Sequence, residues 1–254
     1  MSVLVKDYDP AAVARALDGE GFVCLEGALD GGWIERARAY VHDLVENKGE
    51  RYFALNWPSR EAGSPAAEIT ADPKVRSLLA SLVKLGCPGA GMEDEIYNVL
   101  RVVTGNSSGE KKSLIYHYDA TVVTALAPIL IPKGESRRAG ELLAYPNARG
   151  YRPAALVNVA EKAVMQSDWY RRRITAKLPD GDIPEIRMLE PGNLYLFWGY
   201  RTYHGNFPVA PGMLRATMLM HHGDPHPNSL ILKALKARTV RQEKRNLHAA
   251  GAPA

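Results

Sequence analysis

The chain has 254 residues, 46% of them hydrophobic, which is enough for one sizeable core and near the upper end of what a single domain holds. The net charge of +4 is mixed along the chain, and no recognition motif accompanies it, so we expect no nucleic-acid partner. The N-terminus has no apolar signal core, and the longest apolar run (122–131) is too short to cross a bilayer. Only two cysteines are present. We therefore expect a cytoplasmic protein with no membrane partner.

The N-terminal third has the pattern of amphipathic helices. Asp9, Asp30 and Asp72 each precede apolar residues at helical spacing, which predicts helices over 11–17, around 33–45 and over 73–85. A short apolar strand, 21–25, is expected after the first helix. Segment 49–71 is rich in glycine and proline, and we expect an irregular loop there, either a lid or a surface connection.

From Glu95 onward the pattern changes to β-strands. The expected strands are 96–103, 114–119, 122–131, 140–145, 183–189, 193–198 and 213–221. A charged loop, 133–139, is a second candidate lid, and further helices are expected near 164–173 and 230–247. Helices at the ends with strands between them predict an α+β protein, a single domain over 1–254, whose core is a closed or sandwiched antiparallel sheet.

A histidine and an aspartate stand two residues apart within one of these expected strands. Because side chains alternate along a strand, His117 and Asp119 would point to the same face and form part of a metal site. His204, which follows the strand 193–198, is the best-placed third ligand. His42 and His248 are poorly placed, and we interpret the cluster of His221, His222 and His226 as structural or as an outer layer of the site.

Two histidines and one carboxylate on one face of an octahedron suit Fe(II) and leave three positions open. A 2-oxo acid can fill two of these and dioxygen the third. The far carboxylate of such a co-substrate needs a planar, permanent cation, and Arg215 on the strand after His204 provides one.

The ordered set His117-Tyr118-Asp119, His204 and Arg215 resembles the pattern of Fe(II)/2-oxoglutarate-dependent oxygenases. The fit is closest to the branch that includes phytanoyl-CoA dioxygenase-like proteins and small hydroxylases of amino acids and related metabolites. The resemblance implies a double-stranded β-helix (a jelly-roll, cupin-like core) over about 95–222, with flanking N-terminal helices and a C-terminal helix.

The resemblance also implies roles for single residues. His117, Asp119 and His204 would bind iron, and Arg215 would hold the distal carboxylate of 2-oxoglutarate, with Asn98 or Thr217 assisting.

Two further residue patterns bear on the reaction. Relatives often carry Gly-Ser-His where this chain has Pro146–Arg149, which argues against a coenzyme-A thioester substrate, and the carboxylate of Asp119 fills the position that a halide would need. Hydroxylation is therefore favoured over halogenation.

Substrate contacts are expected from residues that flank the metal-site strands, with a surface role as the alternative for the arginines. The candidates are Tyr97, Arg101, Trp198 and Arg201. Tyr116 and Tyr118 alternate with the ligands, so we expect them to pack behind the sheet.

The leading hypothesis is an enzyme that hydroxylates an unactivated C–H bond of a small polar metabolite, such as an amino acid or a related acid, with Fe(II), 2-oxoglutarate and O2. Two alternatives stay open: a non-catalytic jelly-roll protein that binds a metal or a ligand, and a zinc-dependent isomerase or hydrolase with the same ligands. A homodimer is also left open.

Overall fold

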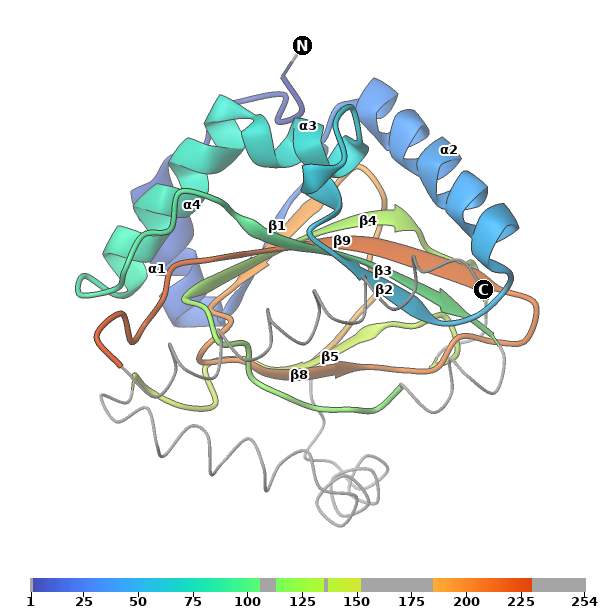
Figure 1. Ribbon diagram of the computed structural model, residues 1–254. Coiled ribbons are helices and arrows are strands. Elements are labelled where there is room, and N and C mark those ends of the chain that lie inside the picture. Colours follow the sequence, from blue (N-terminus) through green and yellow to red (C-terminus); the bar gives the residue numbers. More distant parts are fainter. Residues whose placement is uncertain (1, 106–112, 135–136, 152–184, 230–254) are drawn as a thin grey trace, which may run out of the picture.

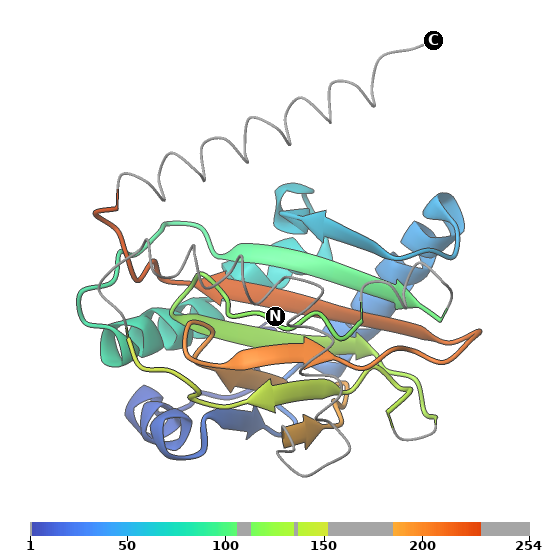
Figure 2. The same cartoon turned by 90° about the horizontal axis from the view of Figure 1, so that it is seen from below.

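The computed structural model describes residues 2–105, 113–134, 137–151 and 185–229. Within these residues, helices cover one face of a six-stranded sheet, and a three-stranded sheet lies against its other face (Figure 1). Figure 2, seen from below, shows the smaller sheet in front of the larger one, with its strands along roughly the same direction. No helix in this part of the chain is long and apolar enough to cross a bilayer.

The predicted N-terminal helices are present. Their bounds are α1 Pro10–Glu20, α2 Gly31–Lys48 and α4 Pro73–Gly86, and β1, Phe22–Leu25, follows α1; a further helix, α3 Pro65–Ala71, was not predicted. The carboxylates of Asp9, Asp30 and Asp72 cap α1, α2 and α4 by accepting backbone N–H groups of the first turn. The left-handed conformation of Gly21 (φ 75°) ends α1 and turns the chain into β1.

The prediction of an irregular loop over 49–71 is wrong. This segment contains β2 (Phe53–Asn56), a short 3-10 helix η1 (Pro58–Arg60) and α3. Its prolines begin helices, because both Pro58 and Pro65 occupy the first helical turn, where a missing N–H costs nothing. The segment therefore belongs to the sheet and the helical layer.

The remaining strands form two sheets in which every pairing among the described residues is antiparallel. Their bounds are β3 Tyr97–Thr104, β4 Val123–Leu130, β5 Leu142–Tyr145, β6 Glu185–Arg187, β7 Leu194–Phe197, β8 Tyr203–Asn206 and β9 Leu214–His222. The larger sheet has the order β1-β7-β4-β9-β3-β2, and the smaller one has the order β6-β5-β8. The coarse prediction of an α+β protein with antiparallel sheets is confirmed.

Alternation along β9 separates the core from a pocket. Ala216, Met218 and Met220 belong to the apolar core that packs against the helices. The intervening residues face the space between the two sheets and line a pocket there: Arg215, Thr217, Leu219 and His221. One strand thus supplies both the core beneath the helices and one wall of the pocket.

Two local predictions around the metal-site residues need correction. Residues 114–119 do not form a regular strand: they join β8 through an isolated bridge between His117 and His204 and a hydrogen bond from Leu114 to Asn206, and Leu114 has a positive φ of 54°. His204 lies within β8 and does not merely follow a strand. The expected helices near 164–173 and 230–247, and residues 135–136 of the expected lid 133–139, lie outside the described residues.

Candidate metal centre and adjoining anion pocket

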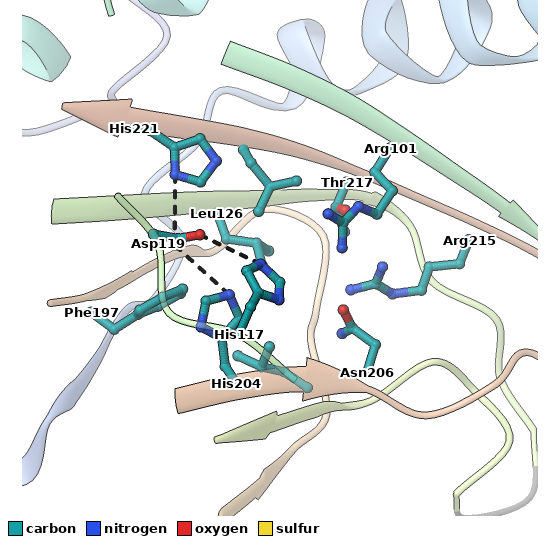
Figure 3. A pocket seen from close by; sticks show the side chains of 12 residues that line it. Arg101, His117, Asp119, Leu126, Phe197, His204, Asn206, Arg215, Thr217 and His221 are labelled. Carbon is teal, nitrogen blue, oxygen red and sulfur yellow. Dashed lines mark ion pairs between the residues drawn. The ribbon is translucent and has the colours of Figure 1, made fainter. Parts of the chain in front are cut away.

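The structure brings together three metal-ligating side chains from two segments. His117 and Asp119 come from the irregular segment before β4, and His204 comes from β8; one ligand atom of each lies within 4.8 Å of those of the others. The Nε2 atom of His117 lies 3.5 Å from Oδ1 of Asp119, and Nε2 of His204 lies 3.7 Å from Oδ2. Figure 3 shows the two imidazoles and the carboxylate turned toward one another.

The second nitrogen of each imidazole already has an acceptor. Nδ1 of His117 lies 3.3 Å from the carbonyl oxygen of Ile115, and Nδ1 of His204 lies 3.1 Å from that of Thr202. A carbonyl oxygen can only accept, so each Nδ1 carries a proton, and in the neutral form of each ring Nε2 is the nitrogen with the lone pair. This is the arrangement that metal-binding histidines adopt, and it fits a divalent cation between them.

Burial sets the charge of these groups. It lowers the pKa of His204 to about 4, so its imidazole is neutral at neutral pH. Burial alone would raise the pKa of Asp119, but the imidazoles of His204, His221 and His117 hold it well below its usual range. The cluster therefore offers imidazole nitrogens and one anionic carboxylate, a set that suits first-row divalent metals.

The same pocket has a cationic end. Arg101 of β3, Asn206 of β8, and Arg215 and Thr217 of β9 line it beside the three ligands, within an empty volume of ≈ 380 Å³ that includes the open mouth. In Figure 3 both guanidinium groups extend into the space next to His117. The pocket thus joins a metal-ligand cluster to a pair of arginines.

Arg215 is a buried cation that no carboxylate among the described residues contacts directly, although the charge of buried Glu141 acts on it from a distance. Its side chain is 2% exposed, and no hydrogen bond or ion pair to its guanidinium occurs among the described residues; Nε in particular has no acceptor. Nε of Arg101 and the hydroxyl of Thr217 lack partners too. Burial, and then the charge of Arg101, lower the pKa of Arg215 to about 9 against the opposing charge of Glu141, which leaves Arg215 charged at neutral pH. Since an unpaired buried charge is costly, these groups indicate an anion-binding site.

Three of the predicted site residues lie elsewhere. Asn98 points to the helix side of the sheet, where its amide bonds Ser59 and the carbonyl of Ile96. Trp198 and Arg201 both donate to Asp18 of α1. These residues fail as pocket contacts because Asn98 and Trp198 occupy the strand face opposite the pocket, and Arg201 sits in the turn after β7.

The tyrosines near the metal-site residues lie on two sides, as expected: Tyr97 on the pocket side, and Tyr116 and Tyr118 away from the ligands. Tyr97 lies on the pocket side of β3, and its ring stacks on His221 at 5.6 Å. Tyr116 packs behind the smaller sheet, on the ring of Tyr203. Tyr118 also stacks with Tyr203, and the Arg149 guanidinium lies 3.7 Å from the centre of its ring.

The sequence reasoning missed Asn206 and Thr124. Asn206 stands two residues after His204 on the same strand, so alternation could have placed it in the pocket. Thr124 lies on β4 and donates to Oδ2 of Asp119 at 2.6 Å. No sequence signal marked it, because its contact depends on the turn that joins Asp119 to β4.

His221 adjoins the metal-ligand cluster without being part of it. Its Nδ1 lies 3.6 Å from Oδ2 of Asp119 and 3.1 Å from the Thr124 hydroxyl. This agrees with the interpretation of His221 as an outer layer of the site.

No protein-family model and no curated protein sequence matches the chain. Solved structures do. The non-heme α-ketoglutarate-dependent epimerase SnoN from nogalamycin biosynthesis aligns over 85% of this chain and 84% of its own, with a TM-score of 0.57 at 17% identity. EctD from S. alaskensis, solved with bound Fe, aligns over 88% of this chain and 81% of its own, with a TM-score of 0.57 at 13% identity.

A Pseudomonas putida prolyl-4-hydroxylase aligns over 87% of this chain and 98% of its own, with a TM-score of 0.53 at 13% identity. SnoN has also been solved in complex with Fe3+, α-ketoglutarate and nogalamycin RO. The chain therefore has the fold of iron- and 2-oxoglutarate-dependent oxygenase structures. At these identities the likeness concerns the fold, and the chemistry has to be argued from the residues of the pocket.

Proposed function

We propose that this protein is an Fe(II)- and 2-oxoglutarate-dependent dioxygenase that hydroxylates a small polar metabolite. The observation that carries the proposal is Arg215, a buried cation that no carboxylate among the described residues contacts directly, in the same pocket as the His117, Asp119 and His204 cluster. A metal site alone fits many reactions. A metal site beside a buried, unpaired guanidinium fits a ligand that has a chelating end and a distal carboxylate.

The metal would be held by Nε2 of His117, Nε2 of His204 and the carboxylate of Asp119. A cation here would neutralise the buried carboxylate, and it would use the lone pairs that the Ile115 and Thr202 carbonyls leave at both Nε2 atoms. With three protein ligands, enough positions stay open for a bidentate co-substrate and dioxygen.

The co-substrate would be held at its other end by Arg215 and Thr217. A guanidinium offers a planar fork of donors that matches a carboxylate, and the Thr217 hydroxyl adds a further donor. Strand alternation places both side chains on the pocket face of β9. A bound carboxylate would supply the partners that these groups lack.

Bound Fe(II) supplies the redox chemistry, in which one oxygen atom of O2 enters the substrate and the other enters succinate as 2-oxoglutarate loses CO2. The chain itself orients the reactants and excludes water. Leu126, Phe197 and Leu219 form apolar walls between the metal end and the larger sheet, and they limit where water can reach.

We further propose that the primary substrate carries an acidic group that binds Arg101. This residue lies directly opposite Thr217 in the sheet register, and it is only partly buried, so it is closer to solvent than Arg215. A second guanidinium exceeds what one distal carboxylate requires, which leaves it for a second anion. An amino acid or related small acid fits this requirement, and Tyr97 near His221 is a further candidate contact.

Two finer assignments belong to the same proposal. The pair of facing antiparallel sheets fits a double-stranded β-helix, and the order of His117, Asp119, His204 and Arg215 fits the phytanoyl-CoA dioxygenase-like branch. A zinc-dependent hydrolase or isomerase with the same ligands would have no need for the buried Arg215. A non-catalytic binding protein would bind the metal and release no succinate.

The test is succinate formation from 2-oxoglutarate by the Fe(II)-loaded protein in air, screened against a panel of amino acids and other small acids. We expect succinate to form, to require Fe(II), and to be lost in Asp119→Ala. In the product, a mass gain of one oxygen would mark hydroxylation. Unchanged turnover in both Asp119→Ala and Arg215→Ala would reject the assignment.

A further inference from the structure

The carboxylate of Asp119 also makes a hydrogen bond with a residue outside the metal-ligand cluster. Thr124, fully buried on the pocket face of β4, donates its hydroxyl to Oδ2 of Asp119 at 2.6 Å. The Thr124 hydroxyl oxygen also lies 3.1 Å from Nδ1 of His221, its direct neighbour in the β4–β9 register. Thr124 therefore stands between a carboxylate and an imidazole.

Asp119 fixes the direction in which protons are donated along the hydrogen bonds between His221, Thr124 and Asp119. An ionised carboxylate can only accept, so the single hydroxyl proton of Thr124 must go to Oδ2. The hydroxyl oxygen then has only lone pairs to offer His221, so Nδ1 of His221 must be the donor. The order of donation is His221 to Thr124 to Asp119, and each group has one role.

The backbone at residue 199 leaves room for these hydrogen bonds only because that residue is a glycine. A Cβ on Gly199 would lie 2.5 Å from Oγ1 of Thr124 and 3.1 Å from Oδ2 of Asp119. Gly199 also accepts the N–H of Asp119 and donates its own N–H to Val122, which fixes the turn that carries Asp119 to β4. A side chain at position 199 would therefore disturb the contact between Thr124 and Asp119.

We propose that Thr124 is a positioning residue for the metal-binding carboxylate: its hydroxyl, held by His221, engages Oδ2 of Asp119 and leaves Oδ1 to the metal. The terminal torsion of an aspartate is soft, so an unrestrained carboxylate can turn both oxygens toward a cation. A second carboxylate oxygen on the metal would occupy one of the positions that a bidentate co-substrate and dioxygen need. This inference rests on the proposed function.

The test compares Thr124→Val with Thr124→Ser in protein loaded with Co(II). Valine keeps the shape and removes the hydroxyl, and serine keeps the hydroxyl. We expect T124V to weaken Co(II) binding, measured by competition with a chelator, by about 10–100-fold, as loss of a partner of a metal ligand does. We also expect its d–d absorption to change, because this absorption depends on coordination number. T124S should match the wild type in both measurements.

Two further variants make the result specific. Thr104→Val removes another buried hydroxyl, one that has no partner, and should leave Co(II) affinity and absorption unchanged. Gly199→Ala keeps the Thr124 hydroxyl but displaces it, and should reproduce the T124V effect; it provides the test if T124V does not fold.

Wild-type affinity and absorption in T124V, or in G199A if T124V does not fold, would overturn the inference and leave the proposed function standing. An equal loss in T124V and T124S would overturn it as well, because the hydroxyl would then be irrelevant. Failure of the wild-type protein to bind Co(II) or Fe(II) at all would reject the proposed function and this inference together.

Discussion

His117 and His204, far apart in the sequence, exchange both of their backbone hydrogen bonds: the N–H of each donates to the carbonyl of the other, at 2.9 and 3.0 Å. This isolated antiparallel bridge brings their imidazole rings to 4.5 Å between centres. Two segments that share no other strand pairing are thereby joined at the residues that face Asp119. Backbone pairing thus contributes to the relative placement of the two histidine ligands.

The first prediction concerns the metal ligands. We expect the wild-type protein to bind one Fe(II) or Co(II) per chain and His204→Ala to bind it more than about 100-fold more weakly, beyond the effect of losing an outer-shell partner. His42→Ala, an exposed position on α2, is the control and should bind as the wild type does. Calorimetric titration of the metal-free proteins measures this. Equal affinities in H204A and H42A would show that the cluster is not the metal site.

The second prediction is that Arg215→Met has opposite effects on ligand binding and on stability. Loss of the guanidinium should weaken 2-oxoglutarate binding by about 100-fold, since truncating one partner of a buried charge pair costs about 2–5 kcal/mol. Without ligand the variant should be at least as stable to urea as the wild type, because it no longer buries an unpaired charge. Arg201→Met, which loses only the contact with Asp18, serves as the matched control for 2-oxoglutarate affinity.

The third prediction separates the two pocket arginines. Arg101→Met should keep the dissociation constant of 2-oxoglutarate within about threefold of the wild type, a difference below 1 kcal/mol. It should raise the KM for an acidic primary substrate while leaving succinate formation dependent on Fe(II). A loss of 2-oxoglutarate affinity as large as that in Arg215→Met would assign both guanidiniums to the co-substrate and remove the argument for an acidic substrate.

The fourth prediction concerns the pH dependence of stability at Asp72. Burial raises the pKa of this carboxyl, but the Ser2 hydroxyl and the backbone N–H groups of Val75, Val3 and Leu4 outweigh burial and lower it. A carboxyl with a lowered folded-state pKa adds stability above its unfolded pKa of about 3.9, and this stability is lost as pH falls through the folded value.

Asp72→Ala should therefore lower the free energy of unfolding by about 2 kcal/mol at neutral pH, at the upper end for a capping residue, and the difference should shrink in acid. Asp9→Ala removes an exposed cap with one hydrogen bond and should cost less. Urea unfolding at several pH values measures both. A D72A difference that stays constant from pH 7 to pH 3 would contradict the account.

The sequence predicted the features that depend on local pattern. Aspartate caps with following prolines marked α1 and α4 within a few residues, and a β-prone pattern marked the strand that carries Arg215 and Thr217. These are properties of short stretches, and their physical causes act within the stretch. The ordered set of His117, Asp119, His204 and Arg215 was found the same way, from residue types and order.

What the sequence could not supply was register and tertiary pairing. Asn98 and Arg101 stand on one strand, but only the alignment of β3 with β9 shows that Arg101 faces the pocket and that Asn98 faces the helices. His117 and Asp119 share a site although their segment is not a regular strand, because the bridge to His204 and the turn at Gly199 hold them. Such contacts join distant segments and leave no periodic signal in either one.

The most direct test of the central claim is an anaerobic titration of the Fe(II)-loaded protein with 2-oxoglutarate, followed by visible absorption. Chelation of Fe(II) by a 2-oxo acid produces a charge-transfer band. We predict that this band appears with the wild type, that it saturates at one 2-oxoglutarate per chain, and that Arg215→Met needs about 100-fold more co-substrate to reach it. A protein that binds Fe(II) yet shows no band at saturating 2-oxoglutarate would contradict the account.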